Sequence, residues 1–236
     1  ALLDLDAGRA AYLNWAGGPD GYAAQAGLWF NPPVPVELAE GAADVLLVNE
    51  RIVEQPWIFS LLPCDRSLRI ADVGGSESTV ALSLATLGHA VEVIDPRGYP
   101  VEHPNLTVHP CRLDEYAGPG GWDAVVCLSA VEHFGLEHYG QDGSDSREDL
   151  AALQHLRAHI AAQGRLLLTV PHGPEFVVAG FERVYDHGAL DELLRGWQVR
   201  SRTVVQRASR TAWERLAPDE HPQARAVAMI EATPQL

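Results

Sequence analysis

LRIADVGGSESTVALSLATLGHAVEVID, residues 68–95, holds two short apolar runs with a helical pattern between them. The first run, 68–73, ends in two glycines and is typical of a buried parallel strand. Apolar residues spaced at i, i+4 and i+7 then predict a helix that ends at Gly88. The second run, 90–94, is followed by Asp95. Together these features predict a strand–helix–strand unit with parallel strands and a right-handed crossover.

The same alternation continues toward the C-terminus. Strands are predicted at 106–109, 124–128, 165–170, 198–206 and 224–232, and helices from Ser146 to Gly164 and from Asp186 to Arg195. The last two strands have no full helix between them, so we expect them to pair antiparallel. The expected fold class is α/β, a Rossmann-like doubly wound seven-stranded mostly parallel sheet with antiparallel C-terminal strands.

Residues 1–62 differ from the rest of the chain. Helical patterns such as 38–59 are interrupted there by glycine and proline at 17–19 and 31–33, and no strand alternates with a helix. We therefore predict two units, a helical cap or lid over residues 1–62 and an α/β core over residues 63–236.

Composition excludes several classes of function. The chain has 236 residues with a formal net charge of −15, and such a charge repels phosphate backbones, so a nucleic acid partner is not expected. All 17 basic residues other than histidine are arginine. Without lysine, neither Schiff-base catalysis nor a P-loop is possible.

Cysteine usage and hydropathy predict the cellular setting. Cys64, Cys111 and Cys127 are odd in number and lack CxxC spacing, which argues against a disulfide framework and against a zinc site. No apolar run approaches the roughly 18 residues that a membrane span needs, and the first residues show no signal-peptide pattern. We expect a cytoplasmic protein with no metal and no membrane partner, whereas its oligomeric state stays open.

Candidate ligand contacts follow the predicted strands, because ligands bind beyond the carboxyl ends of strands in such sheets. After the first strand, Gly74 permits a sharp turn and a close backbone approach to a ligand. Asp95 lies 21 residues beyond Gly74, where a carboxylate can accept both hydroxyl hydrogens of an adenosyl ribose. A generic turn with a helix-capping aspartate is the alternative interpretation of this pair.

Residues 68–96 resemble motif I and the following acidic motif of the class I S-adenosylmethionine-dependent methyltransferases. Asp72 and Gly74 match the family pattern, and Ser76 and Ser78 replace its second and third glycines. This resemblance implies the methyltransferase fold and activity.

Further segments carry the same resemblance. Residues 129–140, SAVEHFGLEHYG, are similar to the segment with Glu-His that follows strand four in many family members, and Pro-His-Gly at 171–173 follows the fifth strand in a similar way. The resemblance covers about residues 65–233. Its motifs are specific for the cofactor class and poorly specific for the substrate.

The resemblance implies S-adenosyl-L-methionine as cofactor and S-adenosyl-L-homocysteine as product. The residues that would contact the cofactor are Asp72, Gly74, Gly75, Ser76, Asp95, Leu113, Asp114 and Ser129. Among them, Asp72 would orient the ammonium group directly or through water, and Asp95 would bind the ribose. Leu113 or Asp114 would meet the adenine, and Ser129 would lie beside the sulfonium.

Arg51 is a further candidate, in the predicted cap. Its guanidinium would bind the cofactor carboxylate by a forked contact. A solvated helix face is an equally good interpretation of this segment.

Methyl transfer is an in-line displacement at a sulfonium, so the protein must hold the nucleophile close and exclude water. A hydroxyl acceptor also needs a base, and imidazole accepts protons near neutral pH. Among ten histidines, His133 is the first candidate because it follows the fourth strand, with Glu132 to stabilise its charged form. His138 and His172 are the next candidates, and a purely structural histidine is the alternative for each.

The function expected from these features is an S-adenosylmethionine-dependent methyltransferase acting on a small molecule. Hydroxyl oxygen is the expected acceptor atom and natural-product or sugar metabolism the expected setting, with nitrogen and carbon left open. Two alternatives remain: a methyltransferase-like protein that binds a ligand without catalysis, and a nicotinamide-dependent Rossmann oxidoreductase. The second would require later glycines that the loop lacks.

Overall fold

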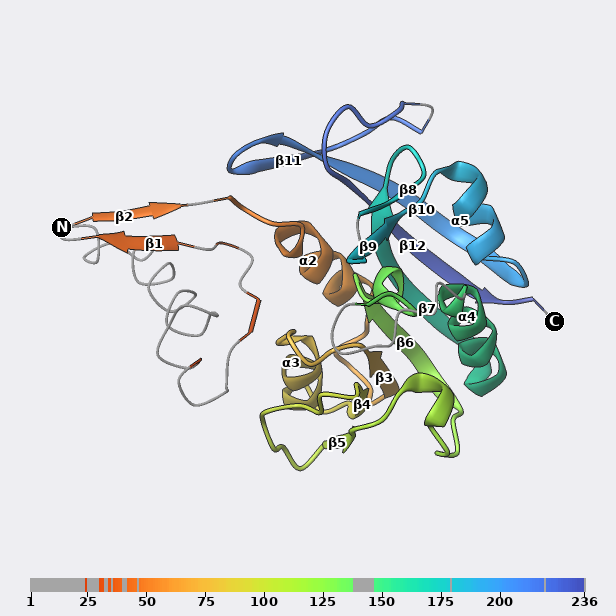
Figure 1. The fold of residues 1–236 in the computed structure, drawn as a ribbon. Coiled ribbons are helices and arrows are strands. Elements are labelled where there is room, and N and C mark those ends of the chain that lie inside the picture. Colours follow the sequence, from red (N-terminus) through yellow and green to blue (C-terminus); the bar gives the residue numbers. More distant parts are fainter. Residues whose placement is uncertain are drawn as a thin grey trace.

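The computed structural model describes residues 24, 30, 31, 34, 36–39, 42–45, 47–137, 147–178, 180–218 and 220–235. Helices cover both faces of one central sheet, which is the layered α/β architecture expected from the sequence (Figure 1).

The central sheet has eight strands in the order β11-β10-β12-β7-β6-β3-β4-β5. Their bounds are β3 Arg69–Val73, β4 Ala90–Ile94, β5 Leu106–His109, β6 Trp122–Leu128, β7 Ile160–His172, β10 Trp197–Ser209, β11 Ala212–Arg215 and β12 Ala226–Pro234. The five strands from β5 to β7 in this order run parallel, and β12 pairs antiparallel with both β7 and β10. This confirms the mostly parallel sheet with antiparallel C-terminal strands.

Two details differ from the expected sheet. An eighth strand, β11, pairs antiparallel with β10 at the edge, where seven strands were expected. The helix expected to reach Gly164 ends at His159 instead, and Ile160 begins β7 by pairing with Trp122. Gly164 therefore lies within the strand, where a Cβ atom would come within 2.6 Å of the Trp122 carbonyl oxygen. Its lack of a side chain permits this close strand contact and does not end a helix.

The core divides between the two faces of the sheet, because successive side chains of a strand point to opposite faces. On one face, α2 (Arg51–Leu61) and α3 (Val80–Thr86) pack through buried residues such as Ile58 and Leu84. On the other face, α4 (Glu148–His159) and α5 (His187–Leu193) pack through Leu153, Leu156 and Leu190. The near-continuous apolar runs of the central strands follow from this burial on both sides.

The short elements that remain border the carboxyl ends of the strands or lie before the sheet. They are η3 Leu113–Glu115, η4 Val131–His133, the antiparallel hairpin β8 Phe176–Val178 and β9 Glu182–Val184, and the antiparallel hairpin β1 Val36–Ala39 and β2 Ala42–Val45.

The hairpin of β1 and β2 corrects one prediction for the N-terminal segment. A helical pattern was expected over residues 38–59, but the chain forms two paired strands within 36–45 and becomes helical only from Arg51. Apolar spacing in short segments fits a strand as well as a helix, so the pattern alone did not distinguish them. Most of residues 1–46 lie outside the described residues, and the division into a cap and a core at residue 62 stays a prediction.

In the described ranges, no helix combines the length and the apolar character that crossing a bilayer would require.

Candidate functional site

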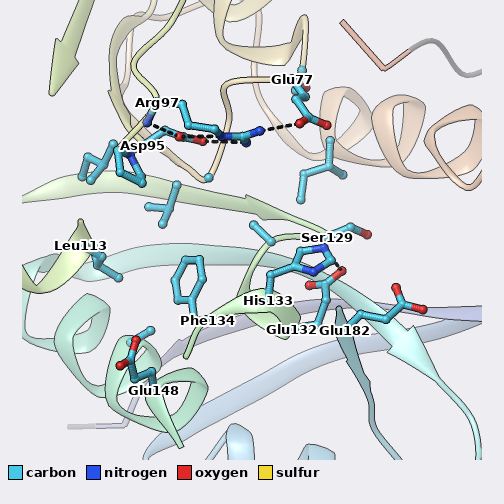
Figure 2. A pocket seen from close by; sticks show the side chains of 18 of the residues that line it. Glu77, Asp95, Arg97, Leu113, Ser129, Glu132, His133, Phe134, Glu148 and Glu182 are labelled. Carbon is cyan, nitrogen blue, oxygen red and sulfur yellow. Dashed lines mark hydrogen bonds and ion pairs between the residues drawn. The ribbon is translucent and has the colours of Figure 1, made fainter. Parts of the chain in front are cut away.

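A cavity of about 490 Å³ lies at the carboxyl ends of β3, β4 and β6 (Figure 2). The structure brings eight of the twelve predicted site residues into its wall: Arg51, Gly74, Asp95, Leu113, Asp114, Ser129, Glu132 and His133. The position of the cavity agrees with the general rule for doubly wound sheets.

Four predicted residues do not line the cavity. Asp72 on β3 and Gly75 and Ser76 in the loop that follows are buried outside its lining, and His172 is buried at the end of β7. The His172 Nδ1 atom lies 2.8 Å from the Tyr185 carbonyl oxygen, which makes it a donor in a structural hydrogen bond. His138, the remaining histidine candidate, lies outside the described residues.

The backbone of the glycine loop leaves no room for side chains. Gly74 has a φ of +72°, and a Cβ atom there would lie 2.5 Å from the Cβ of Ala130. At Gly75 a Cβ atom would lie 2.6 Å from the Asp72 carboxyl carbon. Both glycines are therefore required by neighbouring protein atoms, before any ligand is considered.

Ser76 and Ser78 replace the later glycines of the motif. The Ser76 backbone N–H donates to Asp95 Oδ2 at 3.1 Å and helps hold that carboxylate, a contact that a glycine at this position would also make. Ser78 Oγ accepts a hydrogen bond from the backbone N–H of Val80 at 3.1 Å, at the first turn of α3. Of the two replacements, Ser78 thus contributes a side-chain contact to the start of α3, and it also lines the cavity.

Asp72 is a buried carboxylate without a hydrogen-bond partner. Its side chain is fully buried, and neither oxygen makes a hydrogen bond. Burial, and next the negative charge of Asp95, raise the pKa of Asp72 to about 7, while Arg51 opposes the shift. An unpaired carboxylate beside the glycine loop fits a site that receives a cationic group, since a buried charge without a partner is costly.

We expect Asp72→Asn to change how stability depends on pH. Because folding raises the pKa of Asp72 above its usual 3.8, its contribution to stability is largest below about pH 4 and is lost as the pH rises through about 7. Thermal unfolding of the ligand-free variant should match the wild type at pH 4 and exceed it by about 5 °C or more at pH 8. If the difference in melting temperature between the two proteins were the same at pH 4 and at pH 8, the raised pKa of Asp72 would be contradicted.

Asp95 follows β4 and faces the cavity with only 2% of its surface exposed. Its carboxylate accepts hydrogen bonds from the Arg97 backbone N–H at 2.9 Å and from Arg97 Nε at 3.3 Å. The Arg97 guanidinium also donates to Glu77, so Arg97 bridges the two carboxylates in the wall of the cavity (Figure 2). A ribose at Asp95 must share this carboxylate with Arg97 or displace it.

Residues of η3 also form part of the cavity wall. Leu113 is 8% exposed and offers an apolar surface, whereas Asp114 lies at the rim and pairs with Arg112 at 3.1 Å. Arg112 also pairs with Glu148 of α4 at 2.7 Å. Of the two candidates for an adenine contact, Leu113 is the more enclosed.

Ser129 follows β6 directly and has a backbone conformation that is rare for residues other than glycine, with a φ of 43°. Its N–H donates to the Thr169 hydroxyl at 2.9 Å, and its own hydroxyl donates to Glu54 Oε1 at 2.7 Å. Glu54, fully buried on α2, also accepts a hydrogen bond from Arg51 at 2.8 Å. This network fixes α2 against the end of the central strand.

Glu54 was missed by the sequence reasoning. The three-residue spacing between Arg51 and Glu54 on one helix was a usable signal for their pairing. Its hydrogen bond with Ser129 could not be predicted from a sequence pattern, because the two residues are 75 positions apart.

His133 and Glu132 lie together in η4, below the end of β6. His133 Nδ1 lies 2.5 Å from the Phe181 carbonyl oxygen, and because a carbonyl only accepts, Nδ1 carries the proton. Nε2 is then the nitrogen that takes up a proton, and it lies 3.9 Å from Glu132 Oε1. The carboxylate is close enough to stabilise an imidazolium, although the two residues are adjacent in the chain.

In the described part of the chain, no group of three or more histidine, cysteine, aspartate or glutamate side chains is arranged to hold a metal ion.

Comparison with known proteins identifies the fold. No family model matches the sequence, and no curated protein resembles it significantly. Among solved structures, a protein from Listeria monocytogenes assigned to the S-adenosylmethionine-dependent methyltransferases is similar at a TM-score of 0.53 and 13% identity, covering 78% of this chain and 98% of that one.

Two other solved structures are similar. The glycopeptide N-methyltransferase MtfA has a TM-score of 0.53 at 14% identity, with 79% of this chain and 91% of its own covered. A TehB-like methyltransferase from Corynebacterium glutamicum has a TM-score of 0.50 at 16% identity, with 77% and 87% covered. These similarities and the strand order show that the chain has the class I methyltransferase fold.

Proposed function

We propose that the protein is an S-adenosylmethionine-dependent methyltransferase that acts on a small molecule. The observation that carries the proposal is the meeting of Gly74 and Asp95 in the wall of one cavity, at the ends of neighbouring parallel strands. The fold adds support, because MtfA, similar at a TM-score of 0.51 and 13% identity, is known in complex with S-adenosylmethionine.

The residues of the cavity fit this cofactor. Gly74 would let the methionine portion lie against the loop, Asp95 would bind the ribose, and Leu113 would contact the adenine. Arg51 lines the cavity, where its guanidinium, which also pairs with Glu54, would bind the cofactor carboxylate. The buried Asp72 carboxylate, on β3, would favour a nearby ammonium group. The cofactor supplies a methyl group that is electrophilic without further activation.

The protein's own contribution to the reaction would be positioning and proton removal. His133 would accept the proton of a hydroxyl acceptor at Nε2, and Glu132 would stabilise the imidazolium that results. Phe181, whose ring centroid lies 4.9 Å from that of His133, lines the cavity and would exclude water from the reacting groups.

Several finer expectations remain part of the proposal. They are an oxygen acceptor atom, a natural-product or sugar pathway, the absence of a nucleic acid partner, a cytoplasmic location and a cap over residues 1–62. The net charge of −15 supports a small-molecule substrate. Arg51 and Glu54, both before residue 63, support a role of the N-terminal segment in the site because they reach Ser129 and the cavity.

The test of the proposed function is the affinity of S-adenosylmethionine for Asp95→Ala, measured by calorimetry. We expect a ten- to hundredfold loss, because a hydrogen bond to a charged group contributes about 1.5–3 kcal/mol. Asp123→Ala is the matched control: its carboxylate accepts a hydrogen bond from the Arg69 N–H at 2.8 Å, at the opposite end of the parallel strands. Equal affinities of Asp95→Ala and wild type would refute the ribose contact, and no binding to the wild type would refute the proposed function.

A further inference from the structure

Every arginine in the cavity wall is bound to a carboxylate in the described structure. The pairs are Arg51 with Glu54, Arg97 with Glu77 and Asp95, Arg112 with Asp114 and Glu148, and Arg225 with Glu182 and Glu50. The cationic groups of the wall are therefore already neutralised by the protein, and an anionic acceptor would find its strongest partners occupied.

Glu132 is the carboxylate of the wall that forms no ion pair with an arginine. It is 1% exposed, and its Oε2 atom has no hydrogen-bond partner. Its Oε1 atom lies 3.9 Å from His133 Nε2, which is beyond hydrogen-bond distance. Figure 2 shows Glu132 between His133 and Glu182, at the end of the cavity near Ser129.

The surroundings of Glu132 are acidic. Glu54, Glu182 and Glu50 lie at the same end, against the guanidinium groups of Arg51 and Arg225. Arg183 is buried beneath η4, where it donates hydrogen bonds to the backbone carbonyls of Glu132 and Phe134. Glu54 pairs with Arg51, and Glu50 and Glu182 share Arg225, whereas no ion pair with an arginine is described for Glu132.

From this arrangement we infer that the acceptor carries a positively charged nitrogen and that the Glu132 carboxylate binds it; the inference rests on the proposed function. A carboxylate in an enclosed site, with one oxygen unpartnered, is stabilised most by a ligand that brings both hydrogen-bond donors and a positive charge. Phe134 and Phe181 also line the cavity, and aromatic rings favour a neighbouring cation. The substrate class is thus a small-molecule amine, whichever of its atoms receives the methyl group.

The electrostatic environment of Glu132 agrees with this inference. Burial raises the pKa of Glu132 well above its usual value, and the charges of Glu54 and Glu182 add to the shift against the opposing effect of Arg51. The positive charge of a bound ligand would lower this pKa again, so that the entry of a cation favours the ionised carboxylate.

The test compares two probes of nearly the same shape, benzylammonium and benzyl alcohol, on the protein loaded with S-adenosylhomocysteine. Dissociation constants are measured by NMR titration at physiological ionic strength. We expect benzylammonium to bind at least about tenfold more tightly than benzyl alcohol to the wild type. Glu132→Gln should remove this difference while keeping its affinity for S-adenosylhomocysteine.

Glu192→Gln is the matched control, because it removes the same charge from an exposed carboxylate of α5 that pairs with Arg147. It should keep the preference for benzylammonium. Equal binding of the two probes to the wild type would overturn the inference, and this result does not depend on whether Glu132→Gln folds. A preference for benzylammonium that persists in Glu132→Gln would also overturn it. Failure of the wild type to bind S-adenosylhomocysteine would instead refute the proposed function.

Discussion

Gly74→Val is expected to abolish binding of both S-adenosylmethionine and S-adenosylhomocysteine. The Cβ atom alone would lie 2.5 Å from the Cβ of Ala130, and the backbone there has a φ of +72°. A branched side chain must displace either the loop or the segment after β6, and both form the cavity wall. Calorimetry should show a loss of affinity of more than about a hundredfold, which corresponds to about 2.7 kcal/mol.

Two alanine variants separate the collision from the backbone strain. Gly88 also has a positive φ, of +94°, but a Cβ atom there would meet nothing within 4 Å. Gly88→Ala should therefore lose stability without losing cofactor affinity, whereas Gly74→Ala should lose both. Adding Ala130→Gly to Gly74→Ala should restore part of the affinity, because it removes the methyl group that the new Cβ atom would meet. Normal cofactor binding by Gly74→Val would contradict the assignment of this loop to the cofactor.

His133→Ala is expected to lower kcat by a factor of about 10² to 10⁴, the usual contribution of a general base. The carbonyl of Phe181 holds the proton on Nδ1 and so directs Nε2 to the role of acceptor. Affinity for S-adenosylmethionine should stay near the wild-type value, because the loss concerns proton removal. Both quantities are measured on the same preparation, by formation of S-adenosylhomocysteine and by calorimetry.

His103→Ala serves as the control for the removal of an imidazole. His103 lies in the connection between β4 and β5, where its Nδ1 accepts a hydrogen bond from the Asn105 N–H. This variant should keep its kcat. A decrease of less than fivefold in His133→Ala would contradict the role of base and would indicate an acceptor whose nucleophile is already deprotonated.

The strands of the sheet could be predicted from the sequence, and Ala90–Ile94 and Leu106–His109 have the expected bounds. Apolar runs bordered by turn residues define such strands, although Leu106–His109 lies at the edge of the sheet and is not fully buried. The edge strand β11 was missed because its residues are half-buried or exposed and follow no apolar pattern. The hairpin within 36–45 was missed because four-residue strands give little periodicity.

Some residues of the candidate site could be predicted from the sequence and others could not. Gly74 and Asp95 could be predicted to lie together because each directly follows a predicted parallel strand, and both line the cavity. The pairing of Arg225 with Glu182 joins residues 43 positions apart, and only the folded sheet brings them together. The degree of burial was the other quantity that the sequence did not predict: Asp72, a motif residue, is fully buried and does not line the cavity.

The order of strands has a consequence for how the chain reaches its folded state during synthesis on the ribosome. β12 is made after β10 but lies between β7 and β10, and it contributes all the ladder contacts that join those two strands. While β12 is still being translated, β7 and the hairpin of β10 and β11 each expose an unpaired edge, a state that invites association with other chains. The sheet therefore closes when β12, the last of its strands to be synthesised, inserts between β7 and β10.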